Sequence, residues 1–146
     1  MTRTTNLRRQ HDALLSLVGE LKGEIGKLST LTDAQRIAGL LTRLTGVLSM
    51  HLAAEDKALY PAMMASPDPR TTKCARTFEE QMGGLSEAYM AFAQAWCSPE
   101  RILAEAEAFS RDCETIFDAL AIRIRRENEE LYPLADAMAG TDRNAA

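Results

Sequence analysis

The stretch His51-Leu-Ala-Ala-Glu-Asp-Lys-Ala-Leu-Tyr-Pro61 recurs later in the chain as Arg123-Ile-Arg-Arg-Glu-Asn-Glu-Glu-Leu-Tyr-Pro133. In both copies a glutamate lies six residues before the proline, and a Leu-Tyr pair comes directly before it. Chance does not readily produce such a match twice in a chain of 146 residues. The match indicates a repeated helix hairpin, with histidine at the head of one copy and arginine at the head of the other.

Apolar residues recur at alternating spacings of three and four residues in the segments that precede each copy. The same spacing occurs in two further segments of the chain. This spacing is typical of the buried face of an amphipathic helix. Ser66-Pro67-Asp68-Pro69 is the clearest break in the chain, and Ser98-Pro99-Glu100 has the capping residue and the proline of a helix start. We therefore predict four helices, over about residues 6–28, 33–64, 70–96 and 99–138.

Local signals refine three of these helices. Thr32-Asp33-Ala34-Gln35 has the pattern of a capping box at the start of the second helix. Gly83-Gly84 indicates close packing or a bend in the third, because a helix glycine costs roughly 1 kcal/mol relative to alanine. Gly140 can close the fourth helix. The buried face predicted for the third helix consists of Cys74, Phe78, Gln81, Leu85, Ala88, Phe92 and Ala95.

The composition favours an all-helical protein. Alanine and leucine, which favour helices, number 23 and 18, whereas the β-branched valine and isoleucine number only 2 and 6. A chain of this length is expected to form one domain, covering residues 1–146. Because short connections make consecutive helices antiparallel, we predict an up-down-up-down four-helix bundle.

Charge and cysteine content argue against several classes of protein. The net charge is −4 and no stretch is polybasic, so we expect no nucleic-acid partner. The longest stretch without charge, Ala88–Pro99, is too short to cross a bilayer, and the N-terminus lacks the pattern of a secretory signal. We therefore expect no membrane association and a cytoplasmic location. Cys74, Cys97 and Cys113 are too few and too scattered for a disulfide scaffold or a zinc ribbon.

Four polar side chains lie on the predicted buried faces at one level of the bundle. His11 and His51 are equally distant from the loop between their helices, and Glu55 follows His51 by about one helical turn. Glu127 is the equivalent of Glu55 in the repeat. Buried carboxylates need a partner or a cation, and imidazole together with carboxylate suits iron, manganese or zinc. The sequence therefore predicts a buried cluster, here called the His/Glu cluster, that is able to hold a metal ion.

The opening helix, Leu7-Arg-Arg-Gln-His-Asp-Ala-Leu-Leu15, and the two Leu-Tyr-Pro blocks resemble the bacterial hemerythrin-like (HHE cation-binding) domain over nearly the whole chain. The resemblance implies a non-haem di-iron centre inside a four-helix bundle. In that centre two carboxylates bridge the irons, and an open position binds oxygen or a related small ligand. The resemblance also implies roles in oxygen storage or transport, in oxygen or redox sensing, or in iron handling.

Carried over residue by residue, the resemblance makes His11 and His51 the histidines of one iron, and Glu55 and Glu127 the bridging carboxylates. Histidines from the third and fourth helices normally hold the other iron. This chain has only two histidines altogether, so a five-histidine di-iron site cannot form.

The departures from the family pattern fall on the other half of the site. Arg123 stands at the fourth-helix position, and Thr77 and Gln81 most closely match the third-helix pair. Arg123 lies one turn from Glu127, where its permanent charge can pair bidentately with a carboxylate and would repel a second metal ion.

Three interpretations follow. In the first, the His/Glu cluster holds one iron or zinc ion and leaves positions open for a small ligand. In the second, the bundle is metal-free, Arg123 neutralises both glutamates, and the protein is an interaction or regulatory module. In the third, Gln81, Glu79 or Glu80 supplies substitute ligands for a second ion.

The sequence gives little support for catalysis, because it contains no nucleophile motif and no phosphate-binding loop. A small ligand such as oxygen, a protein partner or a second copy of the chain all remain open as partners. Tyr60 and Tyr132 are expected to cover the end of the bundle with their rings rather than to hydrogen-bond at the site.

Overall fold

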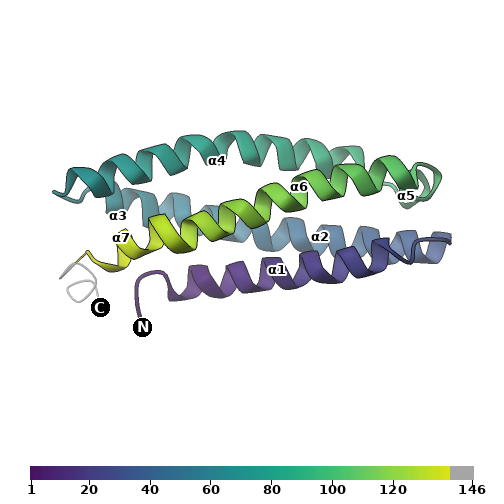
Figure 1. Ribbon diagram of the computed structural model, residues 1–146, viewed down its shortest axis with the longest axis horizontal. Helices are drawn as coiled ribbons and strands as arrows, with labels where there is room; N and C mark the ends of the chain where they lie inside the picture. Colours follow the sequence, from purple (N-terminus) through teal and green to yellow (C-terminus); the bar gives the residue numbers. More distant parts are fainter. Residues whose placement is uncertain (139–146) are drawn as a thin grey trace.

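The computed structural model describes residues 1–138, and every regular element in that range is a helix. The predicted all-helical fold is confirmed. Figure 1 shows long helical rods lying side by side, and the connections between successive rods lie alternately at one end of the bundle and at the other. The elements are α1 (Thr5–Ile25), α2 (Leu31–Ala54), the π-helical turn η1 (Glu55–Leu59), α3 (Tyr60–Met64), α4 (Pro69–Ala95), α5 (Pro99–Ala104), α6 (Ala106–Arg126), the π-helical turn η2 (Glu127–Leu131) and α7 (Tyr132–Asp136).

Helix ends differ from prediction in two places. The capping box of α2 is formed by Thr30 and Asp33, two residues earlier than predicted, because Asp33 Oδ2 accepts the backbone N–H of both Thr30 and Ser29. The predicted fourth helix is interrupted at Glu105, whose φ of −118° and ψ of 45° separate α5 from α6. The predicted cap, Gly140, lies outside the described residues.

The two copies of the repeat form the same irregular structure. In each, the helix widens into a π-helical turn that begins at the glutamate, so that the N–H of Tyr60 bonds the carbonyl of Glu55 and that of Tyr132 bonds Glu127. A proline follows each tyrosine, and proline inside a helix lacks an N–H and clashes with the carbonyl four residues earlier. A π turn before the proline accommodates it without ending the helix.

The buried face of α4 agrees with the predicted face at Phe78 and Phe92, but elsewhere the buried residue is mostly the one after the predicted residue. Gln81 is exposed and Cys74 is only half-buried. Gly83 and Gly84 do not mark close packing, because a Cβ at either position would meet nothing within 4 Å, and α4 continues through them. The buried residues of α4 are Thr71, Ala75, Phe78, Met82, Tyr89 and Phe92.

A polar layer divides the apolar core into two clusters. The larger cluster includes Leu14, Leu48 and Leu120, and the smaller includes Leu7 and Leu131. Along α1, α2–η1 and α6–η2, the residues between these two clusters are the buried histidines, glutamates and arginine that were predicted from the sequence. The fold therefore brings the polar side chains together between two apolar blocks.

The continuous helix Leu31–Met64 is long and apolar enough to span a membrane, judged by length and composition alone. The core helix of a soluble protein meets the same criterion, and the buried apolar residues of α2 here pack in the larger core cluster.

Candidate metal centre

The His/Glu cluster is assembled as predicted. The ligand atoms of His11, His51, Glu55 and Glu127 all lie within 4.8 Å of one another. All four side chains are buried, and α1, α2, η1 and η2 contribute one each. The geometry confirms that the four residues converge in one layer.

The reactive atoms of the cluster face one another. His11 Nε2 lies 2.8 Å from Glu127 Oε1 and 3.1 Å from His51 Nε2. His51 Nε2 lies 3.4 Å from Glu55 Oε2 and 3.6 Å from Glu127 Oε1. Two imidazole nitrogens and two carboxylates thus enclose one small volume, which is the donor set that iron and zinc accept in proteins.

Two amide side chains orient the imidazoles. Gln10 Oε1 lies 2.7 Å from His51 Nδ1, and Asn128 Oδ1 lies 2.8 Å from His11 Nδ1. Because an amide oxygen only accepts hydrogen bonds, each Nδ1 carries and donates its proton, which leaves Nε2 as the ring nitrogen that can face an ion. Metal-binding histidines have outer partners of this kind.

Sequence reasoning missed both amides. Neither Asn128 nor Gln10 is among the candidate site residues that the sequence predicts. The one available signal was their position, since Gln10 directly precedes His11 and Asn128 directly follows Glu127. Each nevertheless bonds an imidazole from a different helix, which only the folded structure shows.

Arg123 occupies the other half of the site and contacts only one of the two carboxylates. Its Nε donates to Glu127 Oε2 at 2.9 Å, and one terminal nitrogen donates to the hydroxyl of Tyr60 at 3.1 Å and to the carbonyl of Phe78 at 2.7 Å. The guanidinium also lies over the Phe78 ring, 4.6 Å from its centroid. The predicted bidentate pair is therefore wrong, and so is the expectation that Arg123 neutralises Glu55, because the guanidinium divides its donors among three residues.

Both repeat tyrosines hydrogen-bond at the site, so the expectation that their rings merely cover the bundle end is wrong. The Tyr132 hydroxyl donates to Glu55 Oε2 at 2.7 Å, and the Tyr60 hydroxyl accepts from Arg123. Burial raises the pKa of both phenols, and the nearby charges of the two glutamates raise it further.

The two glutamates have opposite electrostatic environments. Burial alone would raise the pKa of Glu127, but hydrogen bonds from His11 and His51 and the charge of Arg123 outweigh it and hold that pKa far below the usual range. Burial raises the pKa of Glu55, despite its hydrogen bonds to His51 and Tyr132.

One buried oxygen of the cluster has no partner. Among the described residues, Glu55 Oε1 makes no hydrogen bond although it is fully buried. A buried carboxylate oxygen without a donor is costly, and a cation is one of the few groups that can compensate it. The residues present therefore fit a bound metal ion.

His51 carries positive charge when no metal is bound. Burial lowers its pKa, but the hydrogen bonds and charges of Glu127 and Glu55 outweigh burial and raise the pKa to about 9. At neutral pH an imidazolium therefore occupies the place of a cation between the two carboxylates.

Helix α4 supplies no ligand to the cluster. Thr77, Glu79, Glu80 and Gln81 are all exposed, and the Gln81 amide oxygen accepts from Arg126 at 3.0 Å. The proposed ligand role of Gln81, Glu79 or Glu80 is therefore wrong, because the buried face of α4 is shifted from the predicted one.

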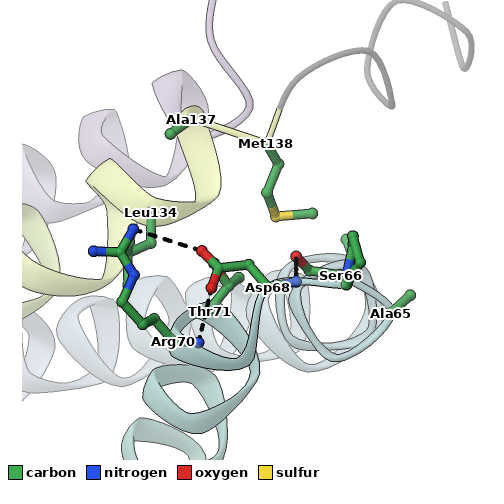
Figure 2. A pocket seen from close by; sticks show the side chains of 10 residues that line it. Ala65, Ser66, Asp68, Arg70, Thr71, Leu134, Ala137 and Met138 are labelled. Atoms are coloured by element: carbon green, nitrogen blue, oxygen red, sulfur yellow. Dashed lines mark hydrogen bonds and ion pairs between the residues drawn. The ribbon is translucent and has the colours of Figure 1, made fainter.

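The space at the cluster is small. A cavity of about 10 Å³, room for one water at most, is lined by His11, His51, Arg123 and Glu127 together with apolar side chains. A cavity of about 370 Å³ lies at the end of the bundle (Figure 2), where Asp68 caps α4 and pairs with Arg70. No cluster residue lines that larger cavity. The free space at the cluster itself therefore holds no more than one water-sized molecule.

Comparisons with known proteins agree with this geometry. A model of the hemerythrin HHE cation binding domain matches residues 2–135. Neither the characterised proteins nor the solved structures gave a significant match. The family match covers almost all of the described chain, including every residue of the His/Glu cluster. This chain therefore belongs to the hemerythrin HHE cation-binding family.

Proposed function

We propose that the protein binds one metal ion, iron or zinc, through His11, His51, Glu55 and Glu127. The observation that carries the proposal is the partnerless Glu55 Oε1, buried in a cluster where the Nε2 atoms of His11 and His51 lie 3.1 Å apart. Two histidines and two carboxylates are a donor set suited to either ion.

Arg123 supports one ion rather than two. Its guanidinium lies where a second ion would need ligands, and its three hydrogen-bond partners hold it there. No described side chain of α4 replaces the missing histidines. A second cation would face both a permanent positive charge and a lack of donors.

A small ligand such as oxygen fits the site best. Leu14, Leu48 and Met82 are among the apolar side chains that line the cavity at the cluster, which has room for one water-sized molecule at most. When bound, the metal ion would supply an open coordination position. We therefore propose binding or sensing of oxygen or a related redox signal, in the cytoplasm, rather than turnover of a substrate.

The alternative is a metal-free regulatory module that acts through a protein partner or a second copy. One observation favours it: without metal, the charges of Arg123 and protonated His51 balance those of Glu55 and Glu127. The charges of the four side chains then sum to zero, although Glu55 Oε1 still has no hydrogen-bond partner.

Metal content per chain distinguishes these possibilities. The untagged protein is purified without chelator from iron-supplemented cells and analysed by elemental mass spectrometry. We expect about one ion per chain, lost in His51→Ala and kept in Gln81→Ala, whose side chain is exposed. Two ions per chain would contradict the role of Arg123. No ion in a stable helical protein would favour the metal-free alternative.

A further inference from the structure

The Tyr132 hydroxyl lies inside the His/Glu cluster. Its oxygen is 2.7 Å from Glu55 Oε2 and 3.3 Å from Glu127 Oε1. It is also 3.1 Å from His11 Nε2 and 3.4 Å from His51 Nε2. One phenol oxygen is thus within 3.4 Å of a donor atom of every cluster residue. An ion that uses these four donors has this fifth oxygen among its neighbours.

Packing fixes the phenol in this position. The Tyr132 side chain is fully buried, and its ring stacks on the His11 ring with centroids 5.1 Å apart. The Arg8 guanidinium lies over the same ring, 5.3 Å from its centroid, and bonds the backbone carbonyl of Asn128. These contacts hold the hydroxyl of Tyr132 at the cluster.

The matching tyrosine of the repeat lies in a different environment. The Tyr60 hydroxyl accepts a hydrogen bond from Arg123, and no hydrogen bond joins it to the four cluster residues within the described part of the chain. The repeat therefore places one tyrosine on the arginine and the other on the predicted ligands.

Charge gives Tyr132 a role once an ion binds. With both imidazoles neutral, two carboxylates and Arg123 carry a net charge of −1, so a divalent ion would leave a charge of +1 in a dry core. Loss of the phenol proton from Tyr132 would bring the sum to zero. Burying a set of paired charges that sum to zero costs far less free energy than burying an uncompensated charge.

We propose that Tyr132 is the fifth protein ligand of the ion and binds it as a phenolate. The O–H bond breaks as the oxygen–metal bond forms, the electron pair stays on oxygen, and the proton leaves to solvent. The site would then offer three anionic oxygens and two imidazole nitrogens, a set suited to iron. This inference rests on the proposed metal-binding function.

Ferric iron is the probe, because a phenolate bound to ferric iron absorbs visible light and a carboxylate or imidazole ligand does not produce that band. The full-length protein is loaded with ferrous iron without oxygen, oxidised in air and freed of excess iron. Iron per chain, visible absorption and the resonance Raman bands of the phenolate ring are then measured.

Three variants assign the band. The chain contains three tyrosines, so Tyr60→Phe with Tyr89→Phe leaves Tyr132 alone. We expect this double variant and Tyr60→Phe to keep the phenolate bands of the wild type. We expect Tyr132→Phe to retain a helical circular dichroism spectrum, to bind iron at least roughly 10-fold more weakly, and to lose the bands.

The possible outcomes separate this inference from the proposed function. Iron bound without phenolate bands in the wild-type protein, or bands that persist in Tyr132→Phe, would overturn the ligand role of Tyr132 and leave metal binding intact. A wild-type protein that binds no iron and no zinc would overturn both. If Tyr132→Phe fails to fold, the wild type and the double variant still decide the question.

Discussion

Replacing Arg123 with methionine should destabilise the metal-free protein strongly. The guanidinium is 7% exposed and forms an ion pair of 2.9 Å with Glu127, whose side chain is 2% exposed. Methionine keeps the contact with the Phe78 ring but leaves the Glu127 carboxylate without its cation. Removing one partner of a buried ion pair costs about 3–5 kcal/mol, which in a chain of this size lowers the melting temperature by roughly 10 °C or more.

Arg126 provides a matched control on the same helix. Its guanidinium lies over the same Phe78 ring, 4.8 Å from the centroid, but its ion pair with Glu130 is exposed. Exposed pairs of this kind contribute about 0.2–1 kcal/mol, so Arg126→Met should change stability by no more than about 1 kcal/mol.

Urea unfolding in chelator and in excess zinc, followed by circular dichroism, measures both effects. Without Arg123 the cluster gains one net negative charge, so zinc should bind at least about tenfold more tightly, or about 1.4 kcal/mol, and stabilise Arg123→Met more than wild type. Equal stability of Arg123→Met and wild type in chelator would refute the view that Arg123 compensates Glu127. Equal stabilisation of both by zinc would refute its influence on the ion.

Three further predictions concern other parts of the molecule. Gly83→Ala and Gly84→Ala should each raise the free energy of unfolding by about 0.5–1 kcal/mol, because each Cβ enters open space; unchanged urea midpoints would contradict this. In the metal-free protein, the raised pKa of His51 contributes stability that is complete below pH 6.5 and is lost as pH rises through about 9. That loss amounts to about 3 kcal/mol by urea unfolding and should be absent in His51→Gln. Asn128→Ala should lower zinc affinity by roughly 10–100-fold in a competition titration with unchanged helicity, since it frees the His11 ring; an unchanged affinity would exclude that positioning role.

In the first, second and fourth predicted helices, one face is clearly apolar and the other polar, so the sequence could place the polar cluster residues on the buried face. In α2, leucines at regular spacing lead directly to His51 and Glu55, so the polar pair could be placed on the buried face. Helix α4 lacks that contrast. Its adjacent residues Cys74 and Ala75 are of similar suitability for a core, and the glycine pair weakens the pattern further.

The roles of the tyrosines and amides depended on geometry that the sequence does not display. Tyr132 reaches the cluster because a π turn precedes it, and Asn128 reaches His11 across two helices. A helical wheel drawn with ordinary α-helical spacing places neither side chain correctly. The four residues of the His/Glu cluster were predictable from residue types and spacing, whereas their outer hydrogen-bond partners required the backbone.

Each π turn sets the orientation of the helical segment that follows it, at the end of the bundle, relative to the cluster residue that precedes it. In an α-helix, residues five apart point about 140° away from each other, yet Glu127 and Tyr132 share one side because the turn between them holds an extra residue. If that turn relaxed to α-helical geometry, the following segment would rotate by about 100° and carry Tyr132 and the buried Ala135 with it. The proline after Tyr132 opposes such relaxation, so the π turn keeps Tyr132 on the same side of the helix as Glu127.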